Sequence, residues 1–219
     1  MSVDAGAMTI PINRLIVAVK VLAALLGFSA IVTEIATLVS VRHFVAANFF
    51  SFFTVESNAL AVVSLLLSSF VAVAGGISAR LEFFRGAVTL FMTTTILIFI
   101  VLLSRLPASE LTAVPWDNTV LHYIMPLVII IDWLMVNRRQ PIEFRRALLW
   151  LAFPLLYLSY SLIRGPIVGW YPYPFMDASA HGYSRVILTS LIIAVVLTGL
   201  TAVISRAPAW MPGRHAVAR

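Results

Sequence analysis

The side chains that could do chemistry are few, and they lie inside long apolar runs. The ionisable ones are Glu34, Glu56, His122 and Asp132, and Thr54 and Asn58 add a hydroxyl and an amide. Ionisable groups placed in lipid are costly and usually functional. A hydroxyl beside an imidazole can act as a nucleophile, because the histidine removes the hydroxyl proton. Thr54 and His122 are the residues that fit this pairing.

Depth in the membrane groups three of these residues. Glu34 lies about six residues before the end of its apolar run, Thr54 about five residues into its run and His122 about four. At 1.5 Å per helical residue, all three lie roughly 6–9 Å below the outer surface. Thr54 and His122 could also have purely structural roles. Threonines in membrane helices commonly bond their own i−4 carbonyl, and a lone buried histidine is commonly a packing residue.

Helical phase separates the polar residues of the second run. Thr54 and Asn58 are one turn apart and share a face, whereas Glu56 is turned away by about 200°. Asn58 is therefore predicted to donate a hydrogen bond to the oxyanion that forms when the Thr54 hydroxyl attacks an ester carbonyl. Glu34 is predicted to orient His122, and Glu56 to support the site from a neighbouring position or to bind a structural partner.

Asp132 lies on the same predicted helix as His122, about 15 Å deeper. It cannot orient the imidazole from there. We expect it to pair with a basic residue such as Arg138 or Arg139.

Other membrane chemistries are excluded by the residue inventory. A single histidine inside the spans cannot provide the paired axial ligands of a di-haem cytochrome. There is no His-Glu-x-x-His motif and no cysteine, so zincin sites and thiolate ligands are also excluded. The spacing of Glu34, Glu56 and His122 selects no particular metal, and the sequence predicts neither a metal nor a cofactor.

The elements that position these residues are membrane spans. Hydrophobic residues make up 61% of the 219 and charged residues 11%, whereas soluble domains are about 45–50% apolar and about 25% charged. The mean hydropathy is +1.01. Runs of about 20 apolar residues are long enough to cross the bilayer as helices. The predicted fold is a single all-α domain over 1–219, a bundle of six transmembrane helices near Leu15–Ser40, Phe49–Gly75, Gly86–Ser104, Asn118–Val136, Ala147–Ile163 and Val186–Ser205.

Charge gives the orientation. Eleven of the 15 Lys and Arg residues, among them Lys20, Arg85 and Arg206, fall on one side of this arrangement. The positive-inside rule then predicts that both termini are cytoplasmic, with 206–219 as a short basic tail. Tryptophans are expected at the two interfaces, Trp133, Trp150 and Trp210 inside and Trp116 and Trp170 outside. The net charge of +6 is spread between apolar runs and does not form a nucleic-acid-binding face.

The fifth loop, 164–185, is the only long one. Within Gly169–Phe175, Pro172 and Pro174 exclude a regular helix, which predicts an extended aromatic segment at the outer surface. It is either an interfacial anchor or, with Arg164 and the aromatic residues Trp170, Tyr171, Tyr173 and Phe175, a binding surface for a lipid carboxylate over the site.

These residues also resemble a known family. Phe52–Asn58 (FFTVESN) is similar to the Phe-Thr-x-Gln-Ser-Asn signature of a bacterial six-span membrane protein family, with Glu56 in place of its Gln. Leu121–Pro126, Asp132–Trp133, Leu162–Gly165 and Gly169–Phe175 resemble its fourth-span and fifth-loop segments. These proteins in turn resemble the animal androgen-induced and androgen-dependent TFPI-regulating proteins, intramembrane threonine hydrolases that cleave fatty acid esters of hydroxy fatty acids.

The resemblance implies an esterase in a bacterial cytoplasmic (inner) membrane, with Thr54 as nucleophile, His122 as base and membrane lipids as substrate and environment. The alternative is a non-enzymatic carrier or lipid-binding protein, in which the same polar residues line a path. That alternative predicts a continuous cavity from His122 to Asp132. The sequence does not fix the oligomeric state.

Overall fold

The computed structural model describes residues 9–76, 78–107, 111–135 and 141–210, and within these ranges it is helical, without strands. Six of its helical spans are long and apolar enough to cross a membrane. They are Arg14–Ser40, Phe53–Val73, Ala79–Leu103, Pro115–Met135, Phe144–Val168 and Tyr183–Pro208. The predicted all-α bundle of six membrane helices is therefore confirmed. The fifth span, expected to be the shortest, has 25 residues.

Several spans are built from more than one helical segment. The first three spans contain α1 (Thr9–Ser40), α3 (Phe53–Val73) after the short α2 (Ala46–Phe49), and α4 (Ala79–Ile98) continued by the π-helical η1 (Phe99–Leu103). The fourth contains α5 (Pro115–Thr119), the π-helical η3 (Val120–Ile124) and α6 (Met125–Met135). The fifth contains α7 (Phe144–Ala147), the 3-10 segment η4 (Leu148–Leu151) and α8 (Ala152–Val168). After η5 (Pro174–Met176) and α9 (Ala178–His181), α10 (Tyr183–Trp210) forms the sixth.

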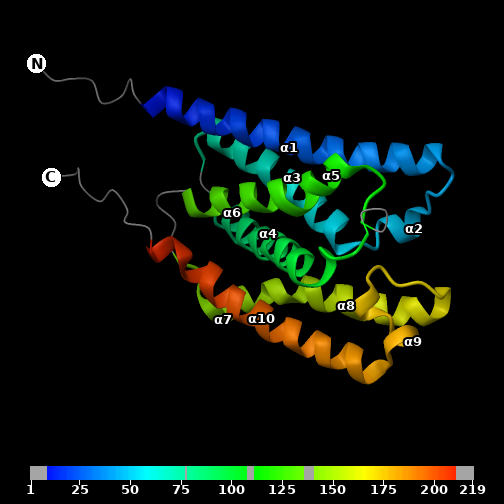
Figure 1. Ribbon diagram of the computed structural model, residues 1–219. Coiled ribbons are helices and arrows are strands. Elements are labelled where there is room, and N and C mark those ends of the chain that lie inside the picture. The colour runs from blue at the N-terminus through cyan, green and yellow to red at the C-terminus, as the bar shows by residue number, and fades with distance from the viewer. Residues whose placement is uncertain (1–8, 77, 108–110, 136–140, 211–219) are drawn as a thin grey trace, which may run out of the picture.

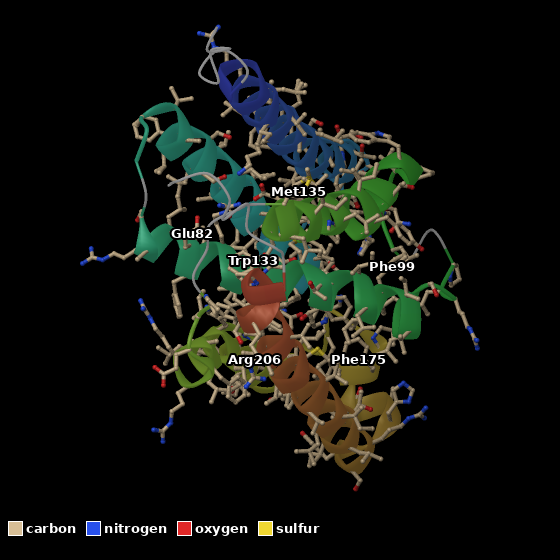
Figure 2. The ribbon with its side chains drawn as sticks, turned by 90° about the vertical axis from the view of Figure 1, so that its left-hand side faces the viewer. Glu82, Phe99, Trp133, Met135, Phe175 and Arg206 are labelled. Atoms are coloured by element: carbon tan, nitrogen blue, oxygen red, sulfur yellow. The ribbon has the colours of Figure 1, made fainter. Side chains whose placement is uncertain are left out.

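The bundle has α4 at its centre. α4 packs against α3, α6 and α10, and α1 packs on α3. Along the bundle, α1 lies at one edge and α10 at the other, with α6 and α4 between them (Figure 2). The start of α1 and the end of α10 lie together at one end, here called the terminal end, while α2 and α9 lie at the opposite, distal end (Figure 1).

The π-helical segment η3 precedes a proline. Pro126 has no N–H to donate to the carbonyl of His122, and a proline ring crowds the carbonyl four residues before it. A single wider π turn relieves both problems, and such turns are frequent at functional sites. Here the wider turn covers Val120–Ile124 and so contains His122 itself.

A buried ion-pair network joins three spans in the terminal half of the bundle. The Asp132 carboxylate accepts from Lys20 Nζ, at 2.8 Å, and from the Arg85 guanidinium, which also bonds Glu82 at 2.9 Å. Lys20 also donates to Ser68. Asp132 is thus held by α1 and α4. The prediction that Asp132 pairs with a following arginine is not supported, and residues 136–140 lie outside the described ranges.

The network also corrects the expected position of two basic residues. Lys20 and Arg85 were counted among the basic residues at the cytoplasmic ends of the spans, yet both are only 6% exposed and lie within α1 and α4. The apolar stem of each side chain packs in the bundle while its charge is neutralised by Asp132.

The expected inner tryptophan belt is wrong at two positions. Trp133 and Trp150 are 3% and 2% exposed, so they belong to the core. Trp133 donates its indole N–H to the Ile204 carbonyl at 3.1 Å. Trp150 fits because Gly86 leaves room for it, since a Cβ on Gly86 would lie 2.4 Å from the indole. The side chain of Trp210, and residues 211–219 of the predicted tail, lie outside the described part of the chain.

Candidate active site

Thr54 and His122 meet near the distal end of the bundle. Thr54 is the second residue of α3, and His122 is in the π turn of the fourth span. The Thr54 Oγ1 atom lies 3.3 Å from His122 Nε2, and the two residues are 8% and 5% exposed. The depth argument placed them at one level, and the fold brings the nucleophile candidate and the base candidate into hydrogen-bond contact.

The other ring nitrogen fixes the histidine tautomer. His122 Nδ1 lies 3.1 Å from the carbonyl oxygen of Asn118, one turn earlier. A carbonyl only accepts hydrogen bonds, so Nδ1 carries the proton and Nε2 presents a lone pair to the Thr54 hydroxyl. The imidazole is therefore set up to receive the hydroxyl proton.

The prediction that Glu34 orients His122 is wrong. Both Glu34 carboxylate oxygens accept from the backbone N–H of Ala113, at 2.8 and 3.0 Å. The carboxyl group of the buried Asp117 lies beside it. Glu34 thus ties the segment before α5 to α1, and the Asn118 carbonyl takes the orienting role. A backbone oxygen at i−4 was available to the imidazole without the cost of burying another charge.

The hydroxyl of Tyr173 contacts Thr54. Its Oη atom lies 3.2 Å from the Thr54 backbone N and 3.3 Å from Thr54 Oγ1. The N–H of Thr54 donates to Oη, because this N–H is among those that have no partner within the first turn of a helix. Burial raises the pKa of the Tyr173 phenol, so the hydroxyl keeps its proton and can donate to Oγ1.

Asn58 does not face the reacting oxygen, and its predicted oxyanion role is wrong. Its Nδ2 donates to the carbonyl of Thr54 at 2.8 Å and to the carbonyl of Leu121 at 3.0 Å. Both amide protons are therefore used. Because Leu121 precedes His122, this amide joins the Thr54 and His122 segments directly, and Asn58 positions them relative to each other.

Glu56 points to a different neighbour, as its helical phase predicts. It lies close enough to Tyr157 and Tyr173 for an electrostatic interaction, and its Oε2 is buried without a hydrogen bond in the described part of the structure. No hydrogen bond between Glu56 and His122 is present within the described residues.

The imidazole is also held by an aromatic ring. Phe99, in the π-helical η1, stacks on His122 with a centroid distance of 4.2 Å and an interplanar angle of 26°. Figure 2 shows Phe99 on the α6 side of α4 and Phe175 on the α10 side. Sequence reasoning missed Phe99, since one phenylalanine in an apolar run carries no signal of this contact. The π segments therefore supply both the histidine and the ring that packs on it.

The fifth loop folds back into the bundle. Gly169 ends α8 in the left-handed conformation, with φ of 66°, which favours glycine. The chain is extended at Tyr173, as predicted, but turns as a 3-10 helix over Pro174–Met176. Tyr173 and Phe175 stack at 5.3 Å with nearly parallel rings. The loop thus delivers a hydroxyl to the site in addition to covering it.

Three predicted binding residues lie away from the cavities. Arg164 donates to Asn48 Oδ1 at 2.6 Å and lies over the ring of Trp170, at 5.4 Å from its centroid. Tyr171 covers Gly165, where a Cβ would lie 2.0 Å from its ring. These contacts fasten the loop to α8 and α2, and none of the three residues lines either of the two cavities at Thr54.

Two cavities meet at Thr54. The first, here called the apolar cavity, has a volume of about 250 Å³ and lies between α4, α8 and α10. The second, here called the His122 cavity, has a volume of about 330 Å³ and lies between α1, α3 and the segments around α5 and η5. Thr54, Leu103 and Tyr173 line both, whereas His122, Glu34 and His43 line only the second. Thr54 thus lies where the two cavities adjoin.

The arrangement is that of a hydroxyl nucleophile with a neutral histidine base.

In the described ranges no group of three or more His, Asp and Glu residues could hold a metal ion. The comparisons with known proteins found no matching family model, curated protein or solved structure.

Proposed function

We propose that this protein is an intramembrane hydrolase that cleaves fatty-acyl lipid esters with Thr54 as nucleophile and His122 as general base. The observation that carries the proposal is the 3.3 Å contact between Thr54 Oγ1 and His122 Nε2. The tautomer set by the Asn118 carbonyl supports it, because the contact is made by the basic nitrogen. The sequence resemblance to threonine hydrolases points to the same pair of residues.

The first half of the reaction forms an acyl-enzyme. His122 Nε2 takes the proton of the Thr54 hydroxyl as Oγ1 attacks the ester carbonyl carbon. The C–O bond to the alcohol then breaks, and the imidazolium returns its proton to the departing alkoxide. The products are acyl-Thr54 and a free alcohol.

The oxyanion is stabilised by the Tyr173 hydroxyl. This hydroxyl accepts from the Thr54 backbone N–H and lies 3.3 Å from Thr54 Oγ1, so its own proton can be donated to a carbonyl oxygen as the oxyanion forms beside Thr54. The N-terminus of α3, a helix of 21 residues, adds a positive partial charge at the same place.

The second half of the reaction needs water beside the histidine. The His122 cavity is lined by polar groups of Glu34, His43 and Thr112 as well as by His122. A water molecule in this cavity loses a proton to Nε2 and attacks the acyl carbon. The C–O bond to Thr54 then breaks, Oγ1 regains the proton, and the carboxylic acid leaves.

A carrier is the alternative, and the packing between the two polar levels argues against it. Neither cavity at Thr54 includes Asp132 in its lining. Between His122 and Asp132 the fourth span presents Met125 and Ile129, which are 0% and 3% exposed and belong to the packed core. Asp132 itself is neutralised by two cations, so it is not a free site for a solute.

The membrane orientation is part of the proposal. The basic residues Arg80, Arg145, Arg146 and Arg206 lie in the described parts of the terminal end. The positive-inside rule then places that end in the cytoplasm and the active site in the outer half of a bacterial cytoplasmic membrane.

The proposal is tested with purified protein, an acyl-ester panel and a fluorophosphonate probe. Thr54→Ala should abolish both hydrolysis and labelling, and Thr54→Ser should keep a measurable rate. Thr201→Ala is the matched control, since Thr201 is fully buried and bonds its own i−4 carbonyl. Mass spectrometry should find the label on Thr54. Equal ester turnover by wild type and Thr54→Ala would overturn the proposal.

A further inference from the structure

We infer that the apolar cavity is the acyl-chain subsite, and that the acyl chain enters it sideways from the bilayer between α8 and α10. This inference rests on the proposed function, because it concerns how an ester lies across Thr54. It assigns the two parts of the substrate to the two cavities and gives the route from lipid to the nucleophile.

The position of the general acid decides which part lies where. The imidazolium must protonate the departing alcohol oxygen, so the alcohol must lie on the His122 side of Thr54. His122 lines only the His122 cavity. The acyl group is on the other side of the scissile bond, which leaves it the apolar cavity.

The lining of the apolar cavity fits a hydrocarbon chain. Besides Thr54 and Tyr173 at its distal end, it consists mainly of aliphatic and aromatic side chains from α4, α8 and α10. Its α10 lining runs from Ser190 to Thr198, a rise of about 12 Å at 1.5 Å per residue. An extended chain advances roughly 1.2 Å per bond, so about ten bonds fit along this wall.

The side of the cavity between α8 and α10 faces the exterior of the bundle. Leu155 on α8 is 54% exposed and Thr198 on α10 is also exposed, yet both line the cavity. The two helices run apart toward the distal end (Figure 1). In a membrane span, an exposed side chain of this kind faces lipid tails. An acyl chain can therefore pass from the bilayer into the cavity without crossing water.

The test uses the chain-length profile of one cavity-filling variant. Ala194 lines the apolar cavity one turn beyond Ser190, so Ala194→Phe should shorten it. In kcat/KM for p-nitrophenyl esters, we expect a loss of about tenfold or more for octanoate and palmitate, with butyrate nearly unchanged. The matched control is Val195→Phe, because Val195 is 73% exposed and does not line the cavity; it should keep the wild-type profile.

A second measurement does not depend on how Ala194→Phe folds. A palmitate ester with a diazirine near the end of its chain is photolysed on Thr54→Ala protein in vesicles, and the adducts are mapped by mass spectrometry. Adducts on Leu155 of α8 or on 193–198 of α10 are expected. Adducts confined to residues of the His122 cavity, such as Leu38 or Leu111, would overturn the assignment.

The outcomes separate this inference from the proposed function. Wild-type turnover by Thr54→Ala would refute the hydrolase itself. An inactive Thr54→Ala together with a folded Ala194→Phe that keeps the wild-type chain-length profile would refute only the acyl-chain subsite.

Discussion

The contact between the Tyr173 hydroxyl and Thr54 can be removed by one conservative substitution. Tyr173→Phe deletes one oxygen and leaves the ring in place. The ring stacks on Phe175 at 5.3 Å and meets the edge of Phe52 at 5.7 Å, and neither contact uses the hydroxyl. The substitution therefore isolates the two hydrogen bonds of Oη to the Thr54 backbone N and Oγ1.

The expected magnitude differs for catalysis and for folding. Loss of one oxyanion donor costs about 10²–10³ in kcat, or roughly 3–4 kcal/mol in the barrier. Loss of the acceptor for the Thr54 N–H costs about 1–3 kcal/mol of stability if that group stays buried and unpaired. Substrate binding involves the ring more than the hydroxyl, so KM should change by much less than kcat.

The assay is steady-state hydrolysis of an octanoate ester in micelles, with thermal unfolding of the same samples. Tyr160→Phe is the matched control, because Tyr160 also carries a hydroxyl bonded to another residue, Ser51 Oγ at 2.9 Å, and this hydroxyl is not bonded to Thr54. It should stay close to wild type in kcat. A Tyr173→Phe enzyme with wild-type kcat would show that the phenol is not an oxyanion donor.

Two further predictions concern stability. Asp132→Asn removes the negative charge shared by two buried cations and should cost about 3–5 kcal/mol, read as a lower unfolding midpoint in micelles; an unchanged midpoint would mean that the network contributes nothing. Gly165→Ala should also lower the midpoint, because the new Cβ would lie 2.0 Å from the Tyr171 ring. Gly199→Ala, with no atom within 4 Å of the new Cβ, should be neutral or slightly stabilising, and equal effects of the two alanines would contradict the packing argument.

The spans were predictable because the bilayer imposes one requirement on each of them. Every backbone polar group in lipid must be bonded within the segment, so an apolar run of sufficient length becomes a helix. The same reasoning placed Thr54 and His122 at one level, since depth along a helix is a count of residues. Their contact then needed only that the second and fourth spans approach each other.

The partners of the polar side chains were much less predictable. Asn58 and Glu34 were assigned to side-chain chemistry, but both bond the backbone, at Thr54, Leu121 and Ala113. Unsatisfied backbone groups gather at helix ends and in loops, and the sequence does not show where such an end will meet a neighbouring span. Side-chain reasoning therefore identified polar residues that the fold brings to one level, and it gave Asn58 and Glu34 bonding partners that they do not have.

The loop hydroxyl was missed for a related reason. The prolines of the fifth loop predict extended chain, and Tyr173 is indeed extended. The depth to which that chain returns depends on the close packing of Tyr171 on Gly165, which is a tertiary contact between large and small residues. The buried Trp150 over Gly86 is the same kind of contact, and it overturned the expected tryptophan belt.

The orienting carbonyl has a chemical consequence for a site inside a membrane. A carboxylate in that position would place a permanent charge beside His122, at a high cost in an apolar medium. With the Asn118 carbonyl instead, threonine and histidine are joined by neutral hydrogen bonds at rest. Charge then develops only as the proton moves. The imidazolium meets the face of Phe99, a favourable cation–π contact, and the oxyanion meets the positive end of α3. In the proposed hydrolase, the Thr54–His122 pair is thus neutral at rest and becomes charged only as the proton moves, which suits a nucleophile that receives its substrate from lipid.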